Sequence, residues 1–149
     1  MSDTAKTLRD QVEPIVEGAG YQVVELSSGV VKGRPHVTLV VYHPDGVSID
    51  DCAELHRTIL PRIELLLDSR DVALQIASPG IERTLKHERE YAVFVGRGVQ
   101  LLIRDDGWVG GRIVASTGTA VEIQTGEGVR TFAFHDIQKA KLDYTQEVR

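Results

Sequence analysis

Residues 72–85 read VALQIASPGIERTL, and this stretch marks where the chain changes character. The first six residues alternate between larger apolar side chains and smaller or polar ones, which is the period of a strand with one buried face. Ser78-Pro79-Gly80 follows directly. Pro79 suits the first corner of a tight turn, and we expect Gly80 to take the positive φ that a type II turn requires. The stretch therefore predicts a strand that ends at a sharp turn.

The residues before this strand predict two helices and two further strands. Apolar residues recur at helical spacing over 8–19, and again over 52–66 after a Ser48–Asp51 pattern typical of a capping box. Residues 21–26 and 36–42 are rich in β-formers. The order αββαβ predicts a two-layer α+β domain in which both helices cover one face of a three-stranded sheet.

The residues after the turn predict a small all-β domain. Short β-rich runs alternate with turn signals over residues 99–104, 108–115, 120–124 and 129–134, and residues 137–142 form a last run. This spacing predicts a small β-barrel of the SH3-like or Sm-like kind, with a bulge or bend at Gly110-Gly111. We place the domains at 1–91, which includes a short charged linker, and 92–149.

The charge of the chain is unevenly distributed. The 149 residues carry a formal net charge of −5. Residues 1–91 hold 10 Lys and Arg against 15 Asp and Glu, whereas residues 92–149 hold 7 of each. A protein that grips phosphate backbone by itself usually has a basic surplus. The balance favours a basic protein partner or a locally basic patch, with solubility alone as the plain alternative.

The sequence predicts a cytoplasmic protein. No apolar run approaches the roughly 18 residues that a membrane span needs, and Met1 is followed by polar and charged residues. The single Cys52 cannot form an internal disulfide, which agrees with a reducing compartment. We expect no membrane contact.

No pattern in the sequence predicts catalysis. The five histidines form no zinc-binding pair, and no phosphate loop, nucleophile elbow or dinucleotide fingerprint is present. His43 and Asp45 are better explained by a polar turn than by a metal, and Asp50 and Asp51 by the start of a helix. Gly96-Arg97-Gly98 is too short for a phosphate loop. We therefore expect no enzyme activity, no metal, no cofactor and no small-molecule substrate.

The segment Ser78-Pro79-Gly80, together with Arg83, is the strongest candidate for a binding site. The turn exposes backbone N–H groups beside the Ser78 hydroxyl, and Arg83 could present its planar guanidinium on the same side, so the group could bind a carboxylate or a phosphate. The plain alternative is a turn that only redirects the chain, with Arg83 paired to a carboxylate at position 82, 88 or 90.

The sequence resembles the RimP family of ribosome maturation factors. The strongest match is residues 74–85, LQIASPGIERTL, which resembles that family's signature of a strand followed by SPG, an acidic residue, Arg and Leu. Looser matches lie at residues 47–52, 12–21 and 137–142. Glu82 stands where the family more often has Asp, and Thr84 where it usually has Pro, so the orientation of Arg83 is less constrained here.

The resemblance implies a KH-like αββαβ domain followed by an SH3-like barrel. It also implies binding to the precursor of the small ribosomal subunit, through 16S rRNA and a basic small-subunit ribosomal protein, with no catalytic residue. We expect a monomer that acts as an assembly chaperone, and we expect Ser78, Pro79, Gly80 and Arg83 to face the subunit or to hold the domain junction. On this view, replacing Arg83 with Ala weakens subunit binding while the fold persists.

Two other functions stay open at this stage. KH-like layers and Sm-like barrels both suggest RNA, so the chain could be a free RNA-binding module that acts on transcripts. A hydrolase or metal enzyme without a recognisable motif is the third hypothesis.

Overall fold

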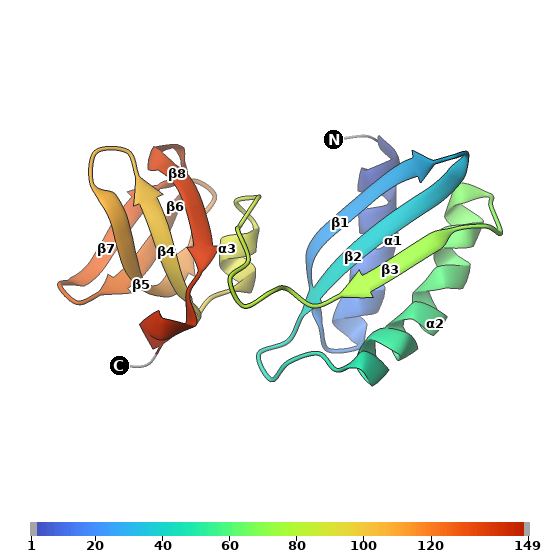
Figure 1. Ribbon diagram of the computed structural model, residues 1–149, viewed down its shortest axis with the longest axis horizontal. Coiled ribbons are helices and arrows are strands. Elements are labelled where there is room, and N and C mark those ends of the chain that lie inside the picture. Colours follow the sequence, from blue (N-terminus) through green and yellow to red (C-terminus); the bar gives the residue numbers. More distant parts are fainter. Residues whose placement is uncertain (1–2, 148–149) are drawn as a thin grey trace. The chain divides into compact units, whose positions relative to one another are not determined.

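The chain folds into two compact units, Met1–Pro79 and Gly80–Arg149. They are drawn in Figure 1, a computed structural model that describes residues 3–147. The division falls inside the Ser78-Pro79-Gly80 segment, so residues 80–91 belong with the second unit. The boundary that we placed after Tyr91 lies further along the chain.

The first unit has the predicted order of elements. It consists of α1 (Asp3–Gly18), β1 (Gln22–Val31), β2 (Arg34–Tyr42), α2 (Ile49–Leu67) and β3 (Ala73–Ala77). The strands form one sheet in the order β1-β2-β3, with β1 antiparallel and β3 parallel to β2. Parallel neighbours need a crossover connection, and α2 supplies it.

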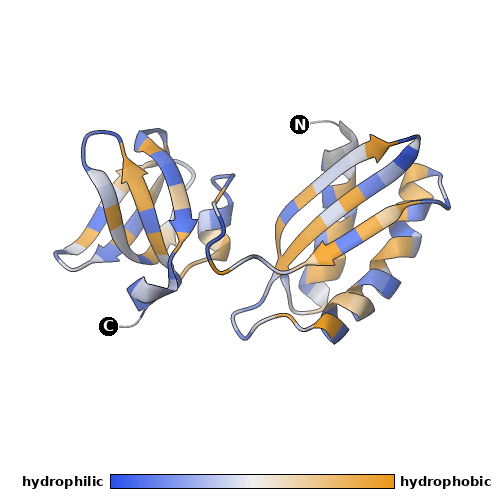
Figure 2. Ribbon diagram, in the orientation of Figure 1, coloured by the Kyte–Doolittle hydropathy of each residue, from blue (hydrophilic) through white to orange (hydrophobic). Residues whose placement is uncertain are grey.

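One apolar core joins the two helices to the sheet, as the amphipathic patterns predict. Hydrophobic residues recur along the strands and along both helices (Figure 2). Leu74 and Ile76 pack against this core while Gln75 between them is exposed, which confirms the predicted faces of β3. The buried members of the core are Leu8, Val12, Val16, Val23, Leu26, Val37, Leu39, Val41, Leu55, Ile59, Ile63 and Val72.

Two local features shape the ends of these elements. The predicted capping box is confirmed: Asp51 N–H donates to Ser48 Oγ at 3.0 Å, and Ser48 N–H donates to an Asp51 carboxylate oxygen at 2.9 Å. Between β1 and β2, Lys32 and Gly33 have φ values of 52° and 79° and join the paired residues Val31 and Arg34. Positive φ at both central residues is the pattern of a type I′ hairpin turn.

The second unit is built on five antiparallel strands. They are β4 (Gly98–Ile103), β5 (Gly107–Ser116), β6 (Ala120–Thr125), β7 (Gly128–Ala133) and β8 (Ile137–Leu142), in the spatial order β7-β6-β5-β4-β8. A short helix α3 (Glu90–Val93) precedes them, the 3₁₀ turn η1 (Phe134–Asp136) separates β7 from β8, and a second 3₁₀ turn, η2 (Tyr144–Glu147), follows β8.

The predicted barrel is not closed. Within residues 3–147 no ladder joins β7 to β8, so these two strands remain the edges of an open sheet. The backbone of η1 bonds elsewhere: Phe134 N–H donates to Thr119 O, and Asp136 O accepts from Arg104 N–H. These bonds hold the connection between β7 and β8 in place without pairing the two strands.

The expected irregularity in β5 lies beyond the two glycines. The register of β5 on β6 shifts between Ile113 and Ala115, not at Gly110-Gly111. A Cβ at Gly111 would collide with the carbonyl oxygen of Gln124 on β6. Gly111 therefore permits β5 and β6 to approach closely. This explains the glycine at this position, where we had expected a bulge or bend.

Candidate functional site

The Ser78-Pro79-Gly80 segment leaves β3 as exposed chain. Ser78 and Gly80 are exposed and Pro79 is half-buried. The turn closes where Arg83 N–H donates to Gly80 O at 3.2 Å, so Ile81 and Glu82 form its corners. Gly80 stands before the corners and does not have a positive φ. The predicted type II turn with Gly80 in the left-handed region is therefore wrong, because the turn begins two residues later than the position of Pro79 suggested.

The chain after this turn runs beside β8. Leu142 N–H donates to Arg83 O and Leu85 N–H donates to Ala140 O, each at 2.8 Å, with Thr84 and Lys141 bridged between them. These bonds attach residues 83–85 to the sheet of the second unit. They explain why the unit begins at Gly80 and why the charged stretch after it is not a free linker.

Arg83 forms a buried ion pair with Glu90. Its Nε lies 2.8 Å from Glu90 Oε1, and the two side chains are 10% and 0% exposed. The other carboxylate oxygen of Glu90 accepts from the backbone N–H groups of Lys86 and His87, at 3.1 and 3.2 Å. A carboxylate can be buried only when its oxygens are paired in this way. The pair therefore ties the turn after Gly80 to the start of α3.

Tyr91 extends this arrangement into the core of the second unit. Its ring is tilted against Phe134 at a centroid distance of 5.0 Å. Burial raises the pKa of Tyr91 to about 12, with the nearby Glu90 and Glu88 carboxylates acting in the same direction. A groove of about 190 Å³ opens beside this pair. The residues that line it are Leu85, Lys86, His87, Glu88, Tyr91, Phe134, Ile137, Gln138, Lys139 and Ala140.

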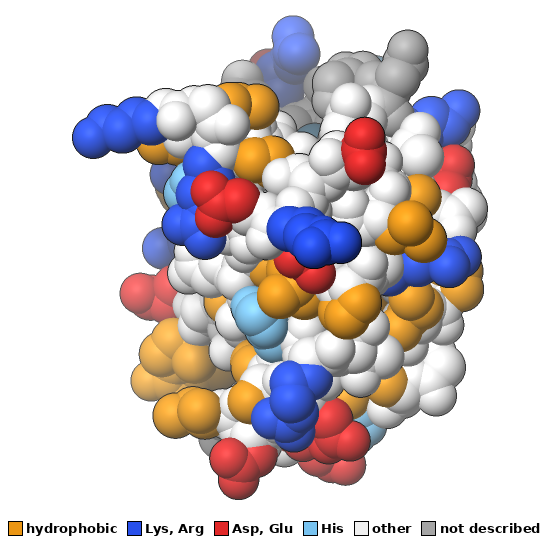
Figure 3. Space-filling view, turned by 90° about the vertical axis from the view of Figure 1, so that its right-hand side faces the viewer, with side chains coloured by type: hydrophobic (Ala, Val, Ile, Leu, Met, Phe, Trp, Pro, Cys, Tyr) orange, Lys and Arg blue, Asp and Glu red, His pale blue; other side chains and the backbone are white. Residues whose placement is uncertain are grey.

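The two units differ in charge when divided where the structure divides them. Residues 1–79 hold 7 Lys and Arg against 12 Asp and Glu, and residues 80–149 hold 10 of each. The net charge of −5 thus belongs to the first unit alone. On the face drawn in Figure 3, basic side chains are scattered among acidic and hydrophobic ones. A face of this kind lacks the continuous basic area that non-specific nucleic-acid binding requires.

The residues that we weighed for metal or acid–base chemistry have structural explanations. His43 Nδ1 accepts a hydrogen bond from Asp45 N–H at 3.0 Å inside a tight turn, and Asp51 belongs to the capping box. Hydrogen bonds from the backbone and side chain of Ser48 lower the pKa of Asp51. In the described part of the chain, no three His, Cys, Asp or Glu side chains are grouped as metal ligands, and no helix has the length and apolarity to span a bilayer.

The chain is similar to known proteins over most of its length. Residues 11–82 match the model of the RimP N-terminal domain. A ribosome maturation factor RimP of Borrelia hermsii is 27% identical over 131 residues, which cover 88% of this chain and 90% of that protein. The RimP of Borrelia recurrentis is 26% identical over 142 residues, which cover 95% and 97%. Both comparisons point to the RimP family of ribosome maturation factors.

The RimP match covers the first unit and ends just past the division of the chain. Residues 11–82 contain the second half of α1, the whole sheet of the first unit and the Ser78-Pro79-Gly80 segment, whereas Arg83 and Glu90 lie outside this match. The relatives from Borrelia carry the similarity on through most of the second unit. The RimP assignment made from residues 74–85 is thus confirmed.

Little in the sequence indicates that Glu90 is the centre of this region. It lies in a run of charged residues, where it was one of three possible partners of Arg83. One signal could have distinguished it: Glu90 directly precedes the apolar residues Tyr91 to Phe94, and so stands at the start of a helical turn that enters the core.

Proposed function

We propose that this chain is a maturation factor of the small ribosomal subunit, which binds the precursor particle without a covalent step. The observation that carries the proposal is similarity along nearly the whole chain to proteins named ribosome maturation factor RimP. Such a factor favours one arrangement of the particle by binding it more tightly than the others, and leaves when the surface matures. The chain then works as a cytoplasmic monomer without cofactor.

The two units take different partners in this proposal. The first, a KH-like layer with a net charge of −5, suits a basic ribosomal protein, because opposite charge raises the rate and selectivity of docking. The second, related to the SH3-like barrels although its sheet is open, has no net charge and carries Lys86 and Lys139 beside its groove. It suits local contact with 16S rRNA.

The residues of the candidate motif have separate roles. Ser78 and Gly80 are exposed and can touch the particle directly, with Pro79 limiting the freedom of the chain between them. Arg83 is too enclosed to reach a large partner, since its side chain is 10% exposed and paired with Glu90. We assign it to holding the turn on which the exposed residues depend.

Co-sedimentation tests the proposal directly. The purified chain is mixed with isolated small subunits, large subunits and whole ribosomes, and each mixture is separated on a sucrose gradient. We expect the chain to travel with small subunits, most strongly with immature ones. Equal binding to large subunits, or none to any particle, contradicts the proposal. Tight and steeply salt-dependent binding to isolated single-stranded RNA would instead favour a module that acts on transcripts.

A matched pair of charge reversals tests the role of the first unit. Asp10→Lys with Glu17→Lys alters exposed positions on α1, whereas Asp105→Lys with Glu127→Lys alters exposed loops of the second unit. Both double variants change the net charge equally. If a basic protein docks on the first unit, only the α1 variant should lose binding to the small subunit. The salt dependence of that binding should be lost in the same variant.

A further inference from the structure

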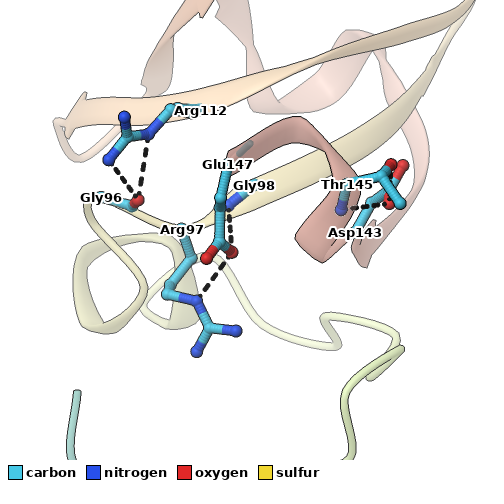
Figure 4. Close-up of polar contacts among 7 residues, drawn as sticks. All are labelled: Gly96, Arg97, Gly98, Arg112, Asp143, Thr145 and Glu147. Atoms are coloured by element: carbon cyan, nitrogen blue, oxygen red, sulfur yellow. Dashed lines mark hydrogen bonds and ion pairs between the residues drawn. The ribbon is translucent and has the colours of Figure 1, made fainter. Parts of the chain in front are cut away.

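The last turn of the chain places a carboxylate among positive groups of the second unit (Figure 4). Glu147 Oε2 accepts from Arg97 Nε at 2.8 Å and from Gly98 N–H at 2.9 Å. The guanidinium of Arg112 lies nearby, held by two bonds of 3.3 Å to Gly96 O. Although burial alone would raise the pKa of Glu147, these donors and the charge of Arg112 lower it. The carboxylate is therefore ionised at neutral pH.

Two glycines, Gly98 and Gly110, lie beneath the turn that carries Glu147. A Cβ at Gly98 would collide with the carbonyl oxygen of Asp143 and lie 2.8 Å from Gln146 Cβ. A Cβ at Gly110 would lie 2.8 Å from the side chain of Gln146. These two glycines, on neighbouring strands, make a flat area that another backbone can approach closely.

The turn η2 is short and partly exposed. η2 is a single 3₁₀ turn of four residues, Tyr144 and Thr145 are exposed, and the Glu147 side chain is 28% exposed. Asp143 anchors its start through hydrogen bonds from Thr145 and from the side chain of Gln100. A short, partly exposed turn opens at low cost compared with unfolding of the unit.

We infer that Arg97, the Gly98 N–H group and Arg112 form a phosphate-binding site, which Glu147 occupies in the free protein and an RNA phosphate takes in the complex. Arginine and backbone N–H donors together are the usual ligands of phosphate, and phosphate offers them more charge and more acceptors than a carboxylate. The glycine surface then lets a sugar-phosphate backbone lie close to β4 and β5. This inference rests on the proposed function, because the RNA is that of the immature subunit.

Removing the competing carboxylate tests the site. Glu147→Ala should bind a fluorescent 16-nucleotide single-stranded RNA about two- to fivefold more tightly than the unaltered chain, the range of a partly exposed ion pair. One additional phosphate contact should steepen the dependence of log K on log salt by about 0.7. Asp105→Ala removes the same charge from the exposed loop at the opposite end of β4 from Gly98, and should leave both values unchanged. Equal behaviour of the two variants overturns the inference.

Two further measurements localise the effect. Adding Arg97→Ala to Glu147→Ala should abolish the gain, and a gain that persists means that the RNA binds elsewhere. In an NMR titration with inorganic phosphate, the Gly98 amide signal of Glu147→Ala should shift and saturate; no shift overturns the site. If a glutamate-rich peptide shifts this signal and RNA does not, the site serves a protein carboxylate and the RNA assignment is wrong. The urea midpoint of each variant, followed by Trp108 fluorescence, shows that it is folded.

The same variants separate this inference from the proposed function. If the unaltered chain fails to sediment with small subunits while phosphate still shifts the Gly98 signal, the proposed function fails and the site stands. If the chain sediments normally while Glu147→Ala and Asp105→Ala bind both RNA and subunits alike, the site fails and the proposed function stands.

Discussion

Replacing Arg83 with Ala should strongly destabilise the second unit. The change takes away the Arg83 guanidinium from the Glu90 carboxylate, which is fully buried and also accepts from two backbone N–H groups. Removing one partner of a buried pair costs about 3–5 kcal/mol. A unit of 70 residues is stable by about 4–10 kcal/mol in total. The variant should therefore lose a large share of its stability, contrary to the expectation from the sequence that its fold persists.

Trp108 makes this loss measurable in the full chain. It is the single tryptophan and lies on β5, so its fluorescence reports on the second unit. With a denaturant slope of about 1 kcal/mol per M for a unit of this size, the urea midpoint should fall by about 3–5 M. Asp106→Ala is the matched control, because it breaks a 2.9 Å pair with Arg130 whose side chains are 40% and 49% exposed. We expect it to cost less than about 1 kcal/mol. Similar shifts in both variants would refute the reasoning.

Three further predictions concern other parts of the fold. Ser48→Ala removes the cap of α2 and should destabilise the first unit by about 1 kcal/mol, seen as a lower urea midpoint by far-UV circular dichroism; an unchanged midpoint would show that the cap is dispensable. Hydrogen bonds from the side chains of Thr145 and Gln100 lower the pKa of Asp143 to about 2. Below about pH 4 the unfolded chain takes up this proton first, so the second unit should lose stability towards pH 2, and Asp143→Asn should flatten that part of the pH profile. Tyr91, whose pKa is raised to about 12, is neutral in the folded state at pH values where the unfolded chain ionises; stability should fall as the pH rises from about 10 to 12, and tyrosinate absorbance that appears before unfolding would contradict this.

The first unit could be predicted well because its determinants are local in sequence. The helical spacing of Leu8, Val12 and Val16, and the Ser48–Asp51 pattern at the start of α2, specify faces and ends without knowledge of distant contacts. The resemblance at residues 74–85 then pointed to the RimP family from one contiguous motif.

The second unit was harder because its decisive contacts join residues far apart in sequence. Whether β7 meets β8 depends on where η1 bonds, and short β-rich runs do not encode this. The conformation of Gly80 depended on a hydrogen bond from Arg83, which itself is oriented by Glu90. Nor did Gly96-Arg97-Gly98 suggest binding until the structure brought Glu147, fifty residues later, beside it.

The hairpin turn between β1 and β2 is a site where one substitution can stabilise the protein. Lys32 occupies a left-handed conformation that costs a branched or long side chain about 1 kcal/mol and suits asparagine or glycine far better. Lys32→Asn should raise the free energy of unfolding of the first unit. Variants of this unit that would otherwise unfold could then still be purified and assayed. One substitution at an exposed tip would thus widen the range of mutations through which the function of this protein can be dissected.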